Sequence, residues 1–276
     1  MISVPEWRAP DLATFEREVL PHDGPAVLRG VVRHWPAVQA GRAGPEAVAA
    51  YIARHDSGAL VDAILMPPEA RGRVFYTSDM QGFNFLRNRV TVGSVIEQVA
   101  RYSHFANAPS VAVQSALMRE CVPGMLAAHR LPLLDASVEP RIWIGNRVIT
   151  PAHFDQSHNI ACVVSGRRRF TLFPPEQLDN LYIGPLDFAP TPTPISLVDF
   201  HAPDFERFPK FRAALETARV VDLEPGDALY IPTLWWHHVE SLGVFNVLVN
   251  YWWRTPDHPG SRSLESVVTA LRQGSR

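Results

Sequence analysis

The spacing of hydrophobic residues along the chain changes from helical to strand-like at about residue 110. Before this point, apolar positions three and four residues apart predict helices over residues 12–20, 45–54 and 92–99. Short apolar runs predict strands over residues 26–32 and 60–66. The first part of the chain, residues 1–109, is therefore predicted to be mixed α/β.

After residue 110 the dominant period is two, which is typical of β-strands. Strands are predicted over residues 110–114, 141–144, 148–155, 159–164, 168–173, 220–223, 228–231, 237–241 and 245–253. Turn signals such as Ser165-Gly166 and Pro225-Gly226-Asp227 separate several of them. Short strands joined by such turns predict a mainly β sandwich or barrel.

Two segments depart from this alternation. Residues 174–209 are rich in proline and aromatic residues and are predicted to form a long ordered excursion. Residues 263–272 predict a helix with one apolar stripe, which packs either on the domain's own body or on a second subunit in a homodimer. No linker or repeat is apparent, so we expect one domain over residues 1–276, with a β core at 110–254 and a helical tail at 255–276.

Composition narrows the class of protein. A formal net charge of -2 argues against a general nucleic-acid binder. The two cysteines do not make a disulfide framework. No apolar run approaches the roughly 20 residues that span a bilayer, and the N-terminus lacks a signal-peptide pattern. We therefore expect a cytoplasmic protein without nucleic-acid or membrane partners.

The candidate chemistry begins with His153 and Asp155, which share one face of a predicted strand because they are two residues apart. Such a pair is common by chance. The late run Trp-Trp-His-His ending at His238 offers a second imidazole from a distant strand. Two histidines and one carboxylate form the facial triad that holds Fe(II) with open positions. Only one of the adjacent His237 and His238 can face inward, and spacing alone does not choose between them.

The residues around these histidines form a larger pattern. It comprises Thr150-Pro-Ala-His-Phe-Asp155, Gly166-Arg-Arg-Arg-Phe-Thr-Leu-Phe-Pro-Pro175, Glu224-Pro-Gly-Asp227 and Asn246-Val-Leu-Val-Asn-Tyr-Trp252. This set resembles the cupin-like, JmjC-related 2-oxoglutarate oxygenases, and especially the branch that contains the asparaginyl hydroxylase inhibiting the hypoxia-inducible factor. The resemblance covers about residues 141–254. It implies a double-stranded β-helix (cupin or jelly-roll) core with N-terminal α/β elements and a C-terminal helix.

The resemblance also implies a ligand set. Fe(II) would be bound by His153, Asp155 and His237, the first histidine of the late pair. Arg168 stands where the family usually has a lysine for the distal carboxylate of 2-oxoglutarate, and Thr150 matches its hydroxyl donor. A guanidinium can hold a carboxylate through two parallel hydrogen bonds. The alternative for Arg168 is a solvated position in an arginine-rich hairpin.

Three further residues match positions that line the co-substrate site in the family: Asn159, Asn250 and Trp252. Buried amides need hydrogen-bond partners. The alternatives are backbone partners at strand ends for the two asparagines and simple core packing for Trp252. One departure is clear, because Ala112 stands where the named hydroxylase has a tyrosine that reaches the distal carboxylate. That hydroxyl is missing or comes from elsewhere.

The function predicted from the resemblance is an Fe(II)- and 2-oxoglutarate-dependent dioxygenase. It would use dioxygen to hydroxylate an unactivated C–H bond of a protein or peptide side chain, or of a small molecule, with release of succinate and carbon dioxide. One alternative is a cupin that uses its metal without oxidation, as an isomerase or a binding module. Another is an interaction module with a relict site. Histone-tail demethylation is not expected, because no acidic tract accompanies the core. His158, His201 and His238 are expected outside the metal site.

Overall fold

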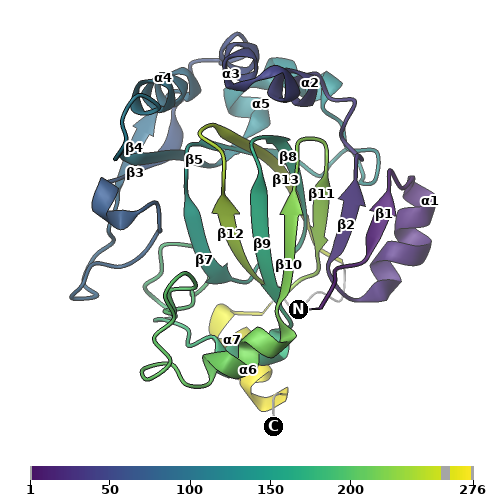
Figure 1. Ribbon diagram of the computed structural model, residues 1–276. Helices are drawn as coiled ribbons and strands as arrows, with labels where there is room; N and C mark the ends of the chain where they lie inside the picture. Colours follow the sequence, from purple (N-terminus) through teal and green to yellow (C-terminus); the bar gives the residue numbers. More distant parts are fainter. Residues whose placement is uncertain (1, 256–261, 275–276) are drawn as a thin grey trace.

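The computed structural model describes residues 2–255 and 262–274, whose strands form the two facing sheets of a jelly-roll barrel (Figure 1). The larger sheet of this part of the chain has the order β1 (Glu6–Arg8), β2 (Ala26–Arg29), β11 (Ala228–Ile231), β8 (His158–Ser165), β13 (Asn246–Trp253), β6 (Pro140–Gly145), β5 (Ser110–Leu117), β3 (Val61–Met66) and β4 (Leu86–Val90). The smaller sheet has the order β10 (Arg219–Leu223), β9 (Arg168–Phe173), β12 (Trp236–Ser241) and β7 (Ile149–His153). The predicted mainly β fold is thus confirmed.

The barrel interior is filled by residues that alternate along strands of both sheets. Phe170 and Leu172 of β9 pack in one buried cluster with Ala161 and Val163 of β8 and with Leu248 of β13. Antiparallel ladders join β9 to β12 and β8 to β13, so the alternation of each strand is carried across its sheet. Once these residues are known to face inward, the alternation determines which other side chains of the same strands point into the barrel.

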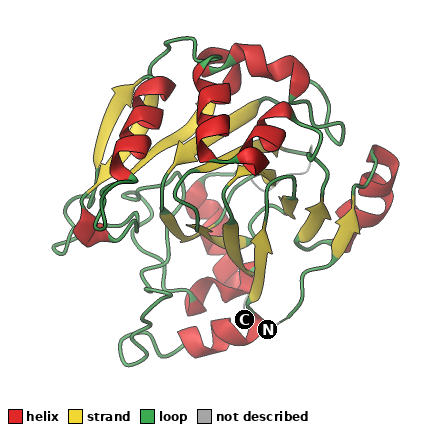
Figure 2. Ribbon diagram, turned by 45° about the horizontal axis from the view of Figure 1, so that its top comes forward, coloured by secondary structure: helices red, strands yellow, loops and turns green. Residues whose placement is uncertain are grey.

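The N-terminal helices cover the outer face of the larger sheet (Figure 2). They are α2 (Pro36–Ala43), α3 (Pro45–Ala53), α4 (Val92–Tyr102) and the short α5 (Met118–Cys121). Thr91 caps α4, because its hydroxyl accepts a hydrogen bond from the Ser94 amide at 3.2 Å. Cys162 is fully buried in the same outer cluster, where it acts as a small hydrophobic residue.

The predicted excursion covers the outer face of the smaller sheet. It contains the 3₁₀ turn η5 (Pro175–Asn180) and leads to α6 (Phe211–Thr217), and both pack with Phe154 and Trp236. The last helix, α7 (Leu264–Gly274), buries Val267 and Val268 in this cluster. Its apolar stripe therefore packs on the protein's own body, and a homodimer stays a prediction. Residues 256–261 of the predicted tail lie outside the described residues.

Several elements differ from the sequence-based expectation. The predicted helix 12–20 is divided into α1 (Leu12–Thr14), the π-helical η1 (Phe15–Val19) and the 3₁₀ turn η2 (Leu20–His22). Two further 3₁₀ turns, η3 (Pro68–Ala70) and η4 (Pro123–Ala128), were not expected either. The strands β1 and β4 and the helices α2 and α6 escaped prediction. Strand β4 is exposed at four of its five residues and carries no apolar alternation, so its pairing with β3 alone makes it a strand.

The described residues contain no helix that is both long enough and apolar enough to pass through a bilayer.

The predicted turn at Asp227 joins β10 to β11 and ties down β2. Its carboxylate accepts a hydrogen bond from the Gly30 amide at 2.9 Å and from Arg29 Nη1 at 2.7 Å. We expect Asp227→Ala to lower the free energy of unfolding by about 1.5–3 kcal/mol, because a charged hydrogen bond is lost and the partly buried Gly30 amide is left unpaired. Urea denaturation measures this. The control is Asp62→Ala, whose carboxylate forms an exposed 3.8 Å pair worth at most about 1 kcal/mol. Equal losses in both variants would contradict the expectation.

Candidate metal centre

Three ligand-bearing side chains meet at one end of the barrel. His237 of β12 pairs directly with His153 of β7, and their ring centroids are 4.2 Å apart. Nε2 of His237 lies 3.5 Å from Oδ2 of Asp155. One ligand atom from each of the three residues lies within 4.8 Å of the others, and the described residues hold no second such group. The residues predicted as metal ligands are thus brought together.

The position of Asp155 has a different cause from the one predicted. Strand β7 ends at His153, so Asp155 does not share a strand face with it. Instead, the Asp155 carbonyl accepts a hydrogen bond from the Leu234 amide at 2.9 Å, in the loop that leads into β12. Leu234 has a φ of 66°, in the left-handed region. This backbone contact holds the turn carrying the carboxylate against the loop that precedes His237.

Both imidazoles are oriented by backbone carbonyls. Nδ1 of His153 lies 3.0 Å from the Pro151 carbonyl, and Nδ1 of His237 lies 3.0 Å from the Trp235 carbonyl. A carbonyl oxygen only accepts, so each Nδ1 carries a proton and Nε2 is the nitrogen of each ring that remains for a metal ion. Burial, and then the neighbouring His237, lower the pKa of His153, which keeps this ring neutral. Neutral rings with a free Nε2 are the form that binds a metal ion.

The carboxylate is oriented by a chain of side-chain hydrogen bonds. Oδ2 of Asp155 accepts from Trp252 Nε1 at 2.9 Å and from Asn159 Nδ2 at 3.3 Å. Asn250 in turn donates to Asn159 Oδ1 at 3.2 Å and accepts from Trp143 Nε1 at 2.8 Å. The asparagines therefore find side-chain rather than backbone partners. Trp143 was missed by sequence reasoning, although its position on β6 follows the inward alternation.

Removing the centre of this chain should loosen the metal centre. In Asn250→Ala, the Trp143 indole loses its acceptor and Asn159 loses its donor, so we expect a loss of about 1–3 kcal/mol in stability. We also expect metal affinity to fall by about 10–100-fold, because groups that orient a ligand contribute on that scale. A competitive chelator titration and thermal unfolding measure the two effects. Trp252→Phe, which removes only the direct bond to Asp155, should weaken metal binding with a smaller loss of stability.

Arg168 lies at the other end of β9, on the inner face that also carries Phe170. Its Nε is buried and has no hydrogen-bond partner among the described residues. Burial lowers the pKa of Arg168 to about 10, so the side chain stays charged at neutral pH. Its neighbour Arg169 points outward and forms a two-pronged pair with Asp222 at 2.8 and 2.9 Å. The solvated-hairpin interpretation therefore describes Arg169, whereas Arg168 is a half-buried cation whose Nε is buried and for which the described residues provide no ion-pair partner.

Thr150 lies between these two ends of the site. It pairs with Val239 of β12, and the register shifts by one residue between this pair and the pair of His153 with His237. This β-bulge lets Thr150 and His153 both face inward although they are three residues apart. Ala112 packs among aliphatic side chains and supplies no hydroxyl. The buried Ser241, which sequence reasoning did not single out, stands directly opposite Arg168 in the ladder of β12 and β9.

The other histidines lie outside the cluster of ligands. His238 points away from the barrel and stacks on Phe200, with ring centroids 4.4 Å apart. Nδ1 of His158 lies 3.1 Å from the Tyr230 hydroxyl. His201, in the excursion, pairs with Glu240 of β12 at 2.7 Å. All three histidines thus lie outside the metal site, as expected from the sequence.

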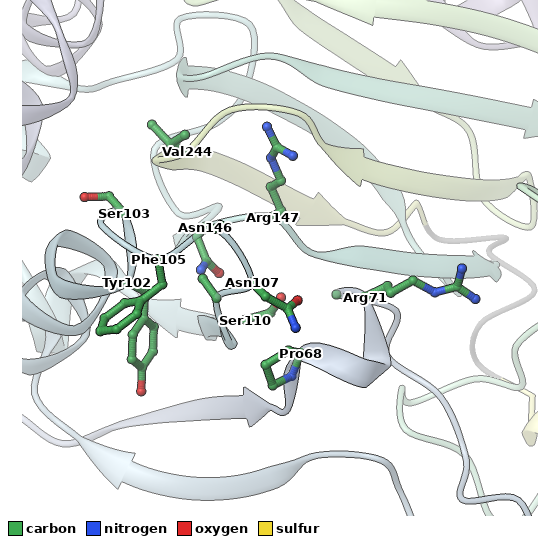
Figure 3. A pocket seen from close by; sticks show the side chains of 13 residues that line it. Pro68, Arg71, Tyr102, Ser103, Phe105, Asn107, Ser110, Asn146, Arg147 and Val244 are labelled. Atoms are coloured by element: carbon green, nitrogen blue, oxygen red, sulfur yellow. The ribbon is translucent and has the colours of Figure 1, made fainter.

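A cavity of about 380 Å³ lies beside the turn between β6 and β7, at the end of β7 opposite to His153 (Figure 3). Figure 3 shows Asn146 and Asn107 among the side chains that line it. The amide of Asn146 is already used, because it accepts from the Val111 amide and donates to the Pro109 carbonyl. This cavity is therefore separate from the metal centre and is lined by a structural turn.

Fold and centre together define a cupin-type barrel with a two-histidine, one-carboxylate metal site at its mouth. The Cupin-like domain family matches residues 12–258, and the chain belongs to this family. JmjC domain-containing protein 5 of Drosophila melanogaster is 26% identical over 259 residues, covering 91% of this chain and 59% of the relative. Human HSPB1-associated protein 1 is 36% identical over 135 residues, covering 48% of this chain and 27% of the relative.

One relative, from a plant, is named as an enzyme. Lysine-specific demethylase JMJ31 of Arabidopsis thaliana is 33% identical over 125 residues, covering 43% of this chain and 22% of the relative. The chain thus spans between about a fifth and three fifths of the length of these relatives. The chain is thus similar to proteins that are named for a JmjC domain.

Proposed function

We propose that this protein is an Fe(II)- and 2-oxoglutarate-dependent dioxygenase that hydroxylates a C–H bond of its substrate. The observation that carries the proposal is the pairing of a metal-ligand cluster at the barrel mouth with a buried, unpaired arginine deeper in the same barrel. A non-oxidative cupin needs the first feature but has no use for the second.

The residues present fit the metal. His153 and His237 would offer Nε2 and Asp155 would offer a carboxylate oxygen, which is the donor set typical of non-haem Fe(II) oxygenases. The fixed Nδ1 protons and the hydrogen bonds to Asp155 hold these donors in place before any ion binds. The chain therefore spends little ordering entropy on metal binding.

The residues also fit the co-substrate. A buried guanidinium without a partner costs free energy that a bound carboxylate recovers. Arg168 would hold the distal carboxylate of 2-oxoglutarate, with Thr150 as a hydroxyl donor and Ser241 close to the same position. Asn159, Asn250 and Trp252 would hold the metal end of the pocket through Asp155. An arginine in place of the family's usual lysine keeps the positive charge and can donate a second, parallel hydrogen bond to the same carboxylate.

When bound, Fe(II) and 2-oxoglutarate supply the oxidising chemistry, in which dioxygen gives one oxygen atom to the substrate C–H bond and one to succinate, with release of carbon dioxide. The chain's own residues act by position. Phe170 and Leu172 exclude water from the barrel around Arg168, which strengthens its attraction for a carboxylate. The hydrogen bonds on Asp155 keep its ligand oxygen directed at the metal.

The substrate is assigned by analogy. We propose a protein or peptide side chain as the first choice, and a small molecule as the second. The hydroxylation of a side chain follows the asparaginyl hydroxylase branch that the motifs resemble. The Arabidopsis relative is named a lysine-specific demethylase, so the C–H bonds of an N-methyl group are another target for the same chemistry.

Succinate formation tests the proposal. Purified protein with Fe(II), ascorbate and 2-oxoglutarate should form succinate slowly without a prime substrate, and faster with one. The Asp155→Ala variant serves as the blank. If no succinate forms with any substrate class, and the variant binds iron as well as the wild type does, the proposed function is wrong.

A further inference from the structure

Arg141 lies on the inner face of the barrel mouth and has no part in the site described above. It precedes Trp143 by two residues on β6, so the two side chains share a strand face. It pairs with Asn250 of β13 in the ladder between these strands. Since β6 starts at the mouth, Arg141 is the residue of this face nearest to the entrance.

The guanidinium of Arg141 is held from one side. Its Nη1 donates to the Ser115 carbonyl at 2.8 Å and to the Ser115 hydroxyl at 3.4 Å. Ser115 lies in a β-bulge of β5, with a φ of 49° in the left-handed region. Such bulges re-aim groups near functional sites. The bulge turns a carbonyl toward the arginine, which fixes its orientation without neutralising its charge.

The remaining donors of Arg141 are free to bind a ligand. A guanidinium carries five N–H groups, and the described residues give no partner to its Nε or Nη2. Arg141 lines a cavity of about 390 Å³ that is also lined by Leu117, Val138 and Trp252. Glu139 is the acidic residue of this cavity, but its carboxylate is paired with Arg119. The cavity therefore presents a cation, and the carboxylate of Glu139 that also lines it is already engaged.

Trp252 connects this cavity to the metal centre. Its ring centroid lies 5.8 Å from Cζ of Arg141, and its indole nitrogen lies 2.9 Å from Oδ2 of Asp155. Arg141 pairs with Asn250 of β13, whereas Asn159 of β8 pairs with Trp252 of the same strand. The two residues therefore lie two strand spacings apart across the sheet and two residues apart along it, or about 12 Å in all. An extended peptide covers that distance in about three to four residues.

We propose that Arg141 is a specificity-determining residue that binds a carboxylate of the prime substrate, and that the substrate is an acidic peptide. This inference rests on the proposed function. The acidic side chain would lie about three to four residues from the residue that reaches the metal, with its stem on Trp252 and Val138. A small acid is too short to contact Arg141 and reach the metal at the same time. A peptide segment is long enough to do both, which favours a peptide as the substrate.

Peptide binding and turnover test this assignment. Fluorescein-labelled peptides of equal length with acidic, neutral or basic residues are titrated against Mn(II)-loaded protein with 2-oxoglutarate, and succinate formation is measured with Fe(II). We expect the wild type to bind the acidic peptides at least about 10-fold more tightly than the neutral ones, because a bidentate charged pair contributes on that scale. Arg141→Glu should reverse the order, and Arg141→Lys should keep part of the preference.

The matched control is Arg169→Glu, which makes the same charge change on the outer face of the barrel and should leave the peptide preference unchanged. If Arg141→Glu binds metal and 2-oxoglutarate normally but keeps the wild-type preference, or if the wild type shows no preference, the inference is wrong while the proposed function stands. If N-acetylaspartate binds as tightly as the acidic peptides, the peptide assignment is wrong. If neither the wild type nor any of these variants binds 2-oxoglutarate, the proposed function itself is wrong.

Discussion

Asp155→Ala should abolish 2-oxoglutarate turnover and weaken Fe(II) binding by more than about 100-fold. Groups that merely orient a metal ligand are worth about 10–100-fold in affinity, so the loss of a ligand exceeds that range. The substitution also removes the acceptor of Trp252 Nε1 and Asn159 Nδ2, which leaves two donors unpaired at the mouth. Calorimetric titration with Fe(II) under argon measures the affinity.

The matched control for this variant is Asp222→Ala. Asp222, near the end of β10, also has a hydrogen-bonded carboxylate, but this carboxylate pairs with Arg169 on the outer face of the smaller sheet. We expect this control to bind Fe(II) as the wild type does. Equal metal affinity in Asp155→Ala and the wild type would remove Asp155 from the metal centre.

Arg168→Ala should weaken 2-oxoglutarate binding by about 2–5 kcal/mol, which is at least about 30-fold in the dissociation constant. The reason is the loss of a charged partner whose Nε is buried on the inner face of β9, which also carries Phe170. Fe(II) affinity should stay unchanged, because Arg168 stands at the far end of β9 from the ligands. Titration of the Mn(II)-loaded protein with 2-oxoglutarate measures the effect.

Two further variants make the test of Arg168 sharper. Arg168→Lys keeps the charge and restores the residue that the family usually has, so we expect an affinity between those of the wild type and Arg168→Ala. Arg169→Ala removes the next arginine along the chain, which faces Asp222 instead of the barrel, and should leave the affinity unchanged. A similar loss in Arg168→Ala and Arg169→Ala would show that the local net charge matters, and not a buried carboxylate site.

Alternation along strands predicted most of the barrel, because a one-residue slip would expose every core residue of a strand. It required Arg168 and Arg169 to face opposite sides of the strand, and likewise His237 and His238, but the resemblance chose which of each pair faces inward. The buried Nε of Arg168, the Asp222 pair of Arg169 and the stacking of His238 on Phe200 agree with that choice. The signal was strong in β9, where Phe170 and Leu172 are buried on the inner face.

Alternation failed where tertiary contacts decide the backbone. Asp155 reaches the metal centre from a turn, because the contact between its carbonyl and the Leu234 amide overrides the continuation of β7. The bulge between Thr150 and His153 depends on the register with β12, which no local pattern records. The bulge at Ser115, which orients Arg141, likewise follows from pairing with β6. These irregular positions are those that shape the mouth.

The most direct test of the account is whether 2-oxoglutarate binding requires both the metal cluster and Arg168. Calorimetric titration of 2-oxoglutarate under argon should be run on the wild type with and without Fe(II), and on Arg168→Ala with Fe(II). We predict tight one-to-one binding only for the wild type loaded with Fe(II), with weak binding in the other two samples. Equal affinity in all three would contradict the account, because the barrel would then hold no joint site for metal and co-substrate.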